Sequence, residues 1–340
     1  YSLKTMSMTE ADGYYRTLGR TYTLDGGKLA CDWPASGIEL TADCKGSVLM
    51  TITSNMDGAI LTVEVDGVVI YDSFTVYKGT RTYIVASGLD EGVHTVKILN
   101  KRGYSKNISI NNIEFYGELK AYTDDRPYIE IVGDSITSGA ENGDVSDGTF
   151  DGSMGSDSRK SYAYMTVDTL GVDYSICSNG GMAISFKKNE NGAVVDSDTN
   201  IFSLMYPYQS RSRDTSLMYE PTRIPDLVII NLHTNDNFRW HANSSLYSKE
   251  DFDTDFEAMI NTLTTNYGNN VQMLFVFGCM TNPTSNYSEM IKHTMDLVDA
   301  YKTKGYNIKR VTLTTNNGNP NGHPDVAGAA LQAEELVKFI

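Results

Sequence analysis

The sequence predicts two domains: an all-β sandwich of jelly-roll topology, then an α/β domain with a flavodoxin-like, parallel five-stranded sheet. Before residue 121, short runs of alternating apolar and polar residues are separated by turn formers, a pattern typical of antiparallel strands. After residue 120, compact apolar runs alternate with helical segments, as in a parallel sheet covered on both faces. We therefore place the domains at 1–120 and 121–340.

Strand patterns account for most of the first domain, and no stretch in it has a helical period. The segment "TVEVDGVVIYD" predicts a hairpin, because alternating residues flank Asp66-Gly67, a pair that favours a two-residue turn. The strand-like runs are "SVLMTITS", "AILTVEVDGVVIYDSF", "TRTYIVASGL", "HTVKILNKR" and "ISINNIEFYGEL".

Five apolar runs predict the strands of the second domain: 128–134, 172–178, 226–232, 271–278 and 308–314. Helices are predicted over 248–268, 287–305 and 325–340, the first of them with a serine cap, an acidic first turn and a closing glycine.

Two long segments of this domain, 141–160 and 186–222, have little regular pattern. Long loops in a compact domain are usually functional or mobile, and ligands of an open parallel sheet sit at the carboxyl ends of its strands.

The net charge of −15 is unevenly distributed, with −2 in residues 1–120 and −13 in residues 121–340. An acidic domain repels phosphate backbones and anionic lipid, so we expect neither nucleic acid nor a membrane as a partner. No apolar run approaches the ~20 residues of a membrane span. The sequence does not indicate an oligomeric state. It begins at Tyr1 with no visible signal peptide, so we treat it as a mature or trimmed form and leave export open.

The cysteines and acidic residues predict no metal and no cofactor. None of the four cysteines forms a C-x-x-C pair. We expect buried thiols, with a Cys31–Cys44 disulfide as the alternative. The acidic loop "ENGDVSDGTFDG" lacks the spacing and terminal glutamate of an EF-hand, and it is interpreted as solvated.

Four residue types with complementary chemistry follow successive strands of the second domain. Ser135 follows the first strand, Gly181 the second, Asn235 the third, and His323 lies between the last strand and the last helix. Taken singly, each has a structural explanation: the serine could cap a short helix, and the others could form turns. Together they supply a nucleophile, two oxyanion donors and a base.

These residues resemble the four sequence blocks of the SGNH (GDSL-type) hydrolases: Gly133-Asp134-Ser135, Gly181, Thr234-Asn235-Asp236 and His323-Pro324. The first domain, through "GRTY", "VDGVVIYD", "VASGLDEGVHTVKILNK" and "INNIEFYGEL", resembles the N-terminal jelly roll of carbohydrate esterase family 2. The resemblance implies Ser135 as nucleophile, His323 as base, and an oxyanion hole made of the Ser135 and Gly181 N–H groups with the Asn235 side chain. Asp134 and Asp236 are interpreted as structural.

Two departures from the family pattern affect these expectations. Pro320 stands where most SGNH hydrolases have an aspartate, three residues before the histidine. The resemblance to family 2 implies a Ser–His dyad whose histidine is held by backbone carbonyls, although some group must orient the imidazole. His233 stands where glycine is usual, and it could line the pocket or alter specificity.

The resemblance implies removal of acetyl groups from plant cell-wall polysaccharides or oligosaccharides of the xylan or mannan type. Trp240 could stack on a sugar or pack under its loop, and Met182 could contact the acyl group. A carbohydrate O-acyltransferase, or a binding protein with a vestigial site, remains as an alternative. A cell-wall substrate favours a secreted or cell-surface bacterial protein, with a cytoplasmic location as the alternative.

Overall fold

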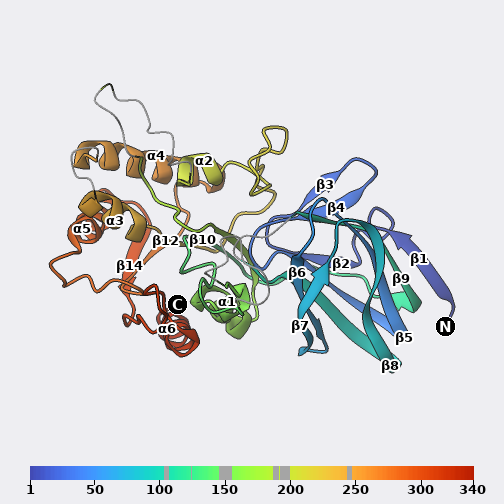
Figure 1. Cartoon of the computed structure of the whole chain (residues 1–340). Coiled ribbons are helices and arrows are strands. Elements are labelled where there is room, and N and C mark those ends of the chain that lie inside the picture. Colours follow the sequence, from blue (N-terminus) through green and yellow to red (C-terminus); the bar gives the residue numbers. More distant parts are fainter. Residues whose placement is uncertain (103–106, 124, 145–154, 187–190, 192–199, 243–246) are drawn as a thin grey trace.

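The structure, a computed structural model, covers residues 1–340 and is described here except for 103–106, 124, 145–154, 187–190, 192–199 and 243–246. A β domain and an α/β domain lie side by side along the long axis of the molecule (Figure 1). The fold class predicted from the sequence is confirmed: an antiparallel β domain comes first, and a five-stranded parallel sheet with helices follows.

The described residues of the first domain form a nine-stranded sheet in the order β3-β4-β9-β5-β8-β6-β7, with β1 on β9 and β2 on β5. Its strands are β1 (Leu3–Ser7), β2 (Tyr15–Leu18), β3 (Tyr22–Leu24), β4 (Lys28–Cys31), β5 (Gly37–Ser54), β6 (Ala59–Val65), β7 (Val68–Val76), β8 (Gly79–Asn100) and β9 (Ile108–Leu119).

The long strands β5 and β8 allow this sheet to fold over its own core. Register shifts between Cys44 and Leu49 interrupt their pairing, and such bulges bend and twist a strand. The hairpin expected at Asp66-Gly67 is confirmed, because Val65 pairs with Val68 and both turn residues have positive φ, 53° and 77°.

The second domain has the strand order β11-β10-β12-β13-β14, and every pair along it is parallel. Numbered along the chain this is 2-1-3-4-5, the flavodoxin-like order. The strands are β10 (Tyr128–Gly133), β11 (Asp173–Ser178), β12 (Leu227–Asn231), β13 (Met273–Phe277) and β14 (Ile308–Thr312). All five lie within the strands predicted from the sequence.

Helices cover both faces of this sheet (Figure 1). Phe252 and Val298, from α4 and α5, belong to the core on one face, and Ala163 and Leu336, from α1 and α6, to the core on the other. The helical elements are η2 (Ser158–Lys160), α1 (Tyr162–Leu170), α2 (Phe202–Met205), α3 (Thr234–Ala242), α4 (Lys249–Tyr267), α5 (Glu289–Thr303) and α6 (Val326–Phe339).

The three predicted helices are confirmed, and the cap of α4 shows why it begins where it does. The Ser248 hydroxyl accepts the Asp251 N–H at 3.0 Å, and Gly268 follows the last turn. The structure decides two local alternatives that the sequence left open. Residues 135–139 form turns rather than a short helix, and Asn235 lies in the first turn of α3.

The expectation of buried free thiols is confirmed, because all four cysteines are free and buried. In the described part of the chain, no helix is long and apolar enough to cross a membrane. Those same residues contain no cluster of three or more His, Cys, Asp or Glu side chains placed to hold a metal.

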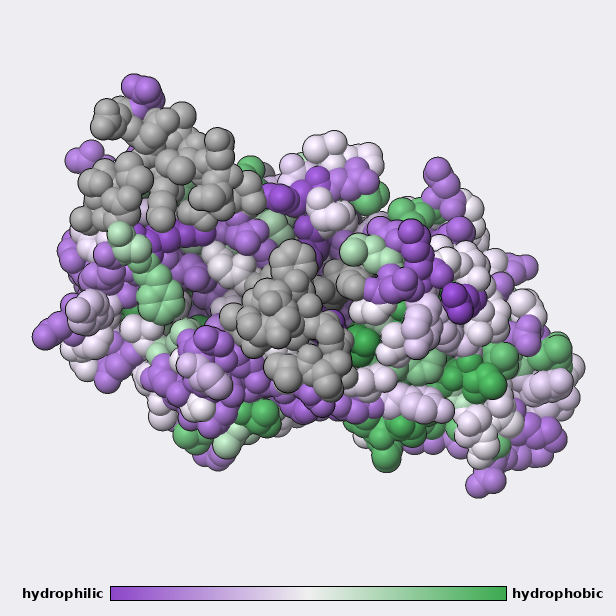
Figure 2. All heavy atoms as spheres, viewed as in Figure 1, coloured by the Kyte–Doolittle hydropathy of each residue, from purple (hydrophilic) through white to green (hydrophobic). Residues whose placement is uncertain are grey.

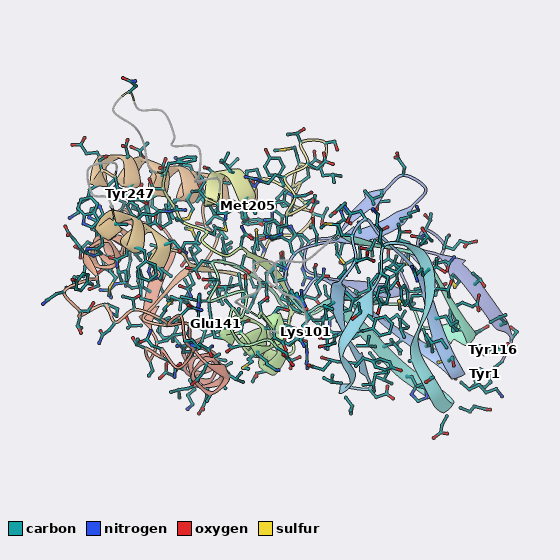
Figure 3. The ribbon with its side chains drawn as sticks, in the orientation of Figure 1. Tyr1, Lys101, Tyr116, Glu141, Met205 and Tyr247 are labelled. Atoms are coloured by element: carbon teal, nitrogen blue, oxygen red, sulfur yellow. The ribbon has the colours of Figure 1, made fainter. Side chains whose placement is uncertain are left out.

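The two domains share packing at their junction. Trp33 of the first domain lies in the core beneath α4, and its indole N–H donates to the Gln209 carbonyl at 2.7 Å. The backbone carbonyl of the buried Lys101, labelled near the junction in Figure 3, accepts a hydrogen bond from the Ser158 N–H at 2.6 Å. The junction is therefore a packed interface rather than a flexible linker.

On the face shown in Figure 2, hydrophobic residues gather mainly on the β domain. The exposed hydrophobic residues of that domain include Val68, Ile70, Ile84 and Val93.

Candidate active site

Ser135 stands immediately beyond the carboxyl end of the central strand β10. Gly133 makes the sharp exit from the strand possible, because a Cβ there would lie 2.0 Å from the Thr137 hydroxyl oxygen. The turn is fixed by backbone hydrogen bonds that include those from Ser138 N–H to the Asp134 carbonyl and from Ala140 N–H to the Ser135 carbonyl. The serine side chain is thereby held at the carboxyl edge of the sheet.

His323 lies on the loop before α6 and meets this serine. Its Nε2 is 2.8 Å from Ser135 Oγ, and the histidine is 8 % exposed. The loop is closed by two hydrogen bonds, from the Gly322 N–H to the Asn319 carbonyl and from the Asn319 N–H to the His323 carbonyl. The sequence placed these two residues 188 positions apart in the same site, and the structure joins them by a hydrogen bond.

The other imidazole nitrogen of His323 meets a carboxylate, which corrects the expected dyad. His323 Nδ1 lies 2.7 Å from Glu141 Oε2, and the Glu141 side chain is 5 % exposed. Figure 3 shows Glu141 inside the α/β domain. Because Nδ1–H donates to this carboxylate, Nε2 is left as the acceptor for the serine proton. The group that orients His323 is therefore Glu141, not a backbone carbonyl.

Sequence reasoning missed Glu141 because it stands in the acidic loop interpreted as solvated. Two features hold its carboxylate in place. The Asn321 backbone N–H and side-chain amide both donate to Oε1, at 2.9 and 2.8 Å. Glu141 itself adopts a positive φ of 66°, which is uncommon for a residue with a side chain.

The charge state of Glu141 suits this role. Burial by itself would raise the pKa of the carboxyl, but the donors from Asn321 and His323 outweigh it and lower the pKa below its ordinary value. Glu141 is therefore ionised at neutral pH, and a carboxylate in this position can stabilise a positive charge on the His323 ring.

Two backbone N–H groups are available for an oxyanion. Gly181 has a φ of 75°, which turns the chain sharply after β11. Among the described residues, neither the Ser135 N–H nor the Gly181 N–H donates a hydrogen bond. Both were expected as oxyanion donors, and that role stays a prediction.

The Asn235 amide is placed beside the same turn but is already engaged. Its Nδ2 donates to the Met182 carbonyl at 3.0 Å and to Asp134 Oδ2 at 3.2 Å. Burial raises the pKa of Asp134 to about 7, against the hydrogen bond from Ile136 N–H and with the help of the Asp236 charge. The Asn235 amide is therefore held by a buried carboxyl whose pKa lies well above its ordinary value.

Asp236 fixes the loop that carries Gly181. It is fully buried and accepts hydrogen bonds from the Ile184 and Ser185 N–H groups and from the Tyr247 hydroxyl. Arg239, one turn later on α3, donates to the carbonyls of Ser185 and Gly181. These contacts agree with the structural interpretation of Asp236.

In the structure the three tentative substrate-binding residues pack against other parts of the chain, and a substrate-binding role for them stays a prediction. His233 is 2 % exposed, stacks on Phe277 and has Nε2 3.0 Å from the Val276 carbonyl. The Met182 side chain is fully buried in the core beneath α4. Trp240 faces α5, where its indole N–H donates to Glu289 Oε2 at 3.0 Å.

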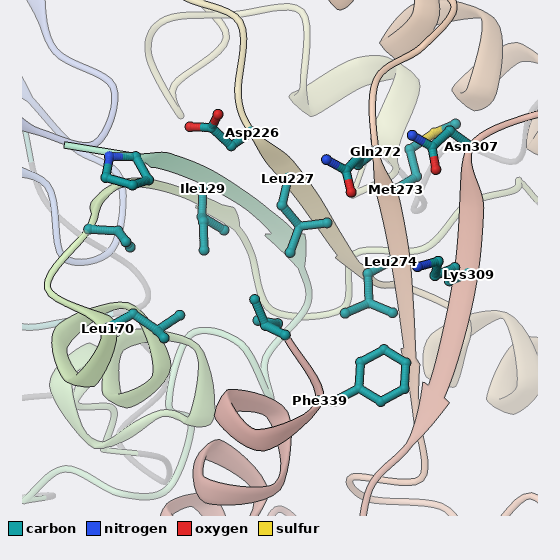
Figure 4. A pocket seen from close by; sticks show the side chains of 13 residues that line it. Ile129, Leu170, Asp226, Leu227, Gln272, Met273, Leu274, Asn307, Lys309 and Phe339 are labelled. Carbon is teal, nitrogen blue, oxygen red and sulfur yellow. The ribbon is translucent and has the colours of Figure 1, made fainter. Parts of the chain in front are cut away.

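A pocket of about 360 Å³ lies at the opposite, amino-terminal edge of the sheet (Figure 4). Aliphatic and aromatic side chains such as Ile129, Leu227 and Phe339 form much of its lining. Its lining lacks a serine or cysteine nucleophile beside a histidine, so this pocket is not the catalytic site.

A flavodoxin-like sheet with a serine, a histidine and a carboxylate hydrogen-bonded in series at its carboxyl edge defines a serine hydrolase. The chain belongs to the GDSL-like lipase/acylhydrolase family, whose model matches residues 129–336. The carbohydrate esterase 2 N-terminal model matches residues 17–120. No match is found among curated proteins.

Solved structures share the fold over the whole chain. A family two carbohydrate esterase from Clostridium thermocellum, in complex with cellohexaose, has a TM-score of 0.80 at 24 % identity, covering 96 % of this chain and 98 % of that one. An acetyl xylan esterase from the rumen bacterium Butyrivibrio proteoclasticus has a TM-score of 0.81 at 17 % identity, covering 100 % and 98 %. A salicylyl-acyltransferase from a tetracycline biosynthetic pathway has a TM-score of 0.65 at 12 % identity, covering 98 % and 95 %.

Proposed function

We propose that the protein is a serine esterase that removes O-acetyl groups from cell-wall polysaccharides or oligosaccharides of the xylan or mannan type. The observation that carries the proposal is the hydrogen-bonded series Ser135 Oγ, His323 Nε2, His323 Nδ1 and Glu141 Oε2, with distances of 2.8 and 2.7 Å. The match of the first domain to a carbohydrate esterase model supports a sugar ester as the substrate.

The first half of the proposed reaction acylates the serine. Ser135 Oγ attacks the acetyl carbonyl carbon while its proton passes to His323 Nε2. The negative charge that develops on the carbonyl oxygen is stabilised by the Ser135 and Gly181 N–H groups and by the Asn235 amide. The C–O bond to the sugar then breaks, and the proton on Nε2 passes to the sugar oxygen as it leaves.

The second half returns the enzyme to its starting state. His323 Nε2 accepts a proton from water, whose oxygen attacks the acetyl-enzyme carbonyl. The Ser135 ester bond breaks, Oγ recovers the proton, and acetate leaves. Glu141 remains ionised throughout and stabilises the imidazolium in both halves.

Acetate release tests the proposal directly. Acetylated xylan, acetylated mannan and 4-nitrophenyl acetate would be incubated with the parent protein and with Ser135→Ala. Release by the parent that is lost in the variant supports the serine esterase, and the faster polysaccharide indicates the substrate. No release from any of the three substrates would overturn the deacetylase. Adding unacetylated oligosaccharide as acceptor distinguishes a transferase, because acetyl would then appear on the acceptor instead of as acetate.

A further inference from the structure

A second cavity, which we call the junction groove, lies between the two domains. It has a volume of about 600 Å³, within the ~300–1,000 Å³ typical of small-ligand sites. The first domain contributes Tyr15, Arg16 and Arg20 to its lining, and the α/β domain contributes Tyr128, Tyr219 and Arg223. Because both domains build it, the groove exists only in the assembled chain.

The junction groove is not part of the catalytic site. Its lining includes Tyr128 and Asp173, the first residues of β10 and β11, whereas Ser135 follows the other end of β10. At about 3.3 Å per residue, this six-residue strand separates its two ends by roughly 17 Å. A ligand in the groove therefore lies near neither Ser135 nor His323.

The lining has the composition of a site for a neutral, hydroxyl-rich ligand. Five tyrosines line it, and the hydroxyls of two of them, Tyr174 and Tyr219, are already bonded to the Ala35 carbonyl and the Tyr267 hydroxyl. Three arginines and three carboxylates balance in charge, so the groove does not select for an anion or a cation. Tyr15 and Tyr122 are half-buried, which leaves part of each ring accessible from the groove.

Ion pairs satisfy the strongest charges in the groove. Asp173 accepts Arg16 Nη1 at 2.5 Å and Arg223 Nη1 at 3.0 Å, and Arg16 Nη2 lies 3.1 Å from Glu39. These contacts compensate the charges of Arg16, Asp173 and Arg223 within the protein, so a neutral ligand fits this part of the groove without a charged partner of its own.

Two arginine donors at the groove remain without an acceptor. Arg16 and Arg20 are 6 % and 4 % exposed, and in the part of the chain that the structure describes the Nε of each has no hydrogen-bond partner. A buried donor without an acceptor is costly, and most buried polar groups are paired. Both Nε atoms are covered by protein, so contacts to a ligand in the groove fall to the exposed part of its lining, which includes Tyr15, Tyr122 and Thr222.

We propose that the junction groove is a second binding site, which holds a neutral oligosaccharide segment apart from the catalytic serine. The groove is connected to the active site through one segment of chain. Gln209 lines the groove, and two residues later the Arg211 guanidinium donates to Asn179 Oδ1, at 2.7 and 2.9 Å, close to Gly181. The ligand class is inferred from the groove itself; the identification of this glycan with the substrate of Ser135 rests on the proposed function.

The test measures binding without turnover, so it stands apart from the test of the esterase. In a Ser135→Ala background, Thr222→Trp and Thr17→Trp would fill the groove from two sides, since both threonines line it and are exposed. Thr215→Trp is the matched control, because Thr215 is exposed in the same segment as Thr222 but does not line the groove. Thermal unfolding checks that all three variants fold.

Xylohexaose, mannohexaose and cellohexaose would be titrated into each protein by isothermal calorimetry. We expect at least one hexaose to bind both the Ser135→Ala protein and the Thr215→Trp control. In the two groove-filling variants, Thr222→Trp and Thr17→Trp, one binding component should be lost, with the affinity for the hexaose lowered by at least about tenfold. Equal binding in fillers and control, or no binding of any hexaose to the background, would overturn the proposal. So would inorganic phosphate binding that the fillers abolish while hexaose binding is unchanged.

Discussion

The carboxylate of Glu141 lies 2.7 Å from Nδ1 of His323, and Nε2 of the same ring lies 2.8 Å from Ser135 Oγ. Ser135 and Glu141 are six residues apart in one segment after β10. His323 is brought to them from near the other end of the chain. Each part of this arrangement leads to an outcome that can be measured.

Glu141→Gln should lower kcat while leaving the protein folded. The amide keeps the shape of the side chain but loses its charge, so it no longer stabilises the imidazolium or requires the Nδ1–H tautomer. From the corresponding change in serine-protease triads, we expect a loss on the order of 10²–10⁴ in kcat on 4-nitrophenyl acetate. Glu257→Gln, on the exposed face of α4, is the control. A kcat equal to that of the parent would show that Glu141 is not needed and would support a Ser–His dyad.

Asn235→Ala should lower kcat by about 10²–10³ with a smaller change in KM, because an oxyanion donor acts mainly in the transition state. The alternative is that the amide only ties Met182 to Asp134. In that case the variant would lose thermal stability and keep its kcat. Steady-state kinetics and thermal unfolding, measured on the same preparation, separate these outcomes.

Gly181→Ala should reduce kcat without a steric clash. The nearest atom to an added Cβ is Asn200 Nδ2 at 3.8 Å, so space is available. The positive φ is unfavourable for alanine, however, and relaxing it would turn the N–H away from the oxyanion. Unchanged kcat in a folded variant would remove this N–H from the oxyanion hole. Gly171→Ala, at the positive-φ end of α1, is a matched backbone control.

His233 should make stability depend on pH. Burial lowers the pKa of His233 to about 4, against an unfolded value near 6.5. Between these values the unfolded state binds the extra proton, so stability is fully present above pH 6.5 and is lost as pH falls toward 4. This amounts to ~1.4 kcal/mol per unit, on the order of 3 kcal/mol in all.

His233→Phe keeps the stack on Phe277 and removes the titration. In urea unfolding from pH 4.5 to 7.5, the free energy of unfolding of the variant should rise relative to that of the parent as pH falls. A difference between the two proteins that does not change with pH would show that His233 is not buried as a neutral imidazole. The kcat at pH 7 should be retained, since the ring touches neither Ser135 nor His323.

Arg20→Met should destabilise the whole chain. The Arg20 guanidinium is buried between Tyr206 and Tyr219, at 4.3 and 3.6 Å from the ring centres, and lies 3.5 Å from the buried Glu130. Removing one partner of a buried pair leaves an uncompensated charge and costs about 3–5 kcal/mol.

Adding Glu130→Gln to Arg20→Met should recover part of this loss. Arg81→Met, on the exposed surface of the β domain, should stay within about 0.5 kcal/mol of the parent in urea unfolding. A loss for Arg20→Met no larger than that of Arg81→Met would show that the ion pair does not join the domains.

Much of the fold could be predicted because its signals come from residues that are neighbours in the sequence. The β10, β12 and β13 strands are nearly continuous apolar runs, and α4 has its cap and stop signals in the sequence. The hairpin at Asp66-Gly67 follows from the two-residue turn. Hydrophobic pattern and capping signals among neighbouring residues indicate these elements before their distant partners are known.

What the sequence did not show has one main cause, which is that burial of a polar side chain depends on distant partners. Glu141 was taken as solvated, yet its carboxylate is buried against the His323 loop. The packing of His233 against β13 likewise depends on a residue far along the chain. Trp240 lies on the side of α3 that faces Glu289, because residues 235 and 240 point in different directions on a helix.

The sequence by itself determined the two domains, the parallel sheet and the positions of Ser135, Gly181, Asn235 and His323 at the ends of its elements. Those features follow from period and local turn chemistry, which are properties of neighbouring residues. Only the tertiary structure decided that Glu141 orients His323, that Asn235 is shared with Asp134, and that a groove opens at the domain junction. These depend on contacts between residues far apart in the chain, and the free energy of such contacts has no signature in a local pattern.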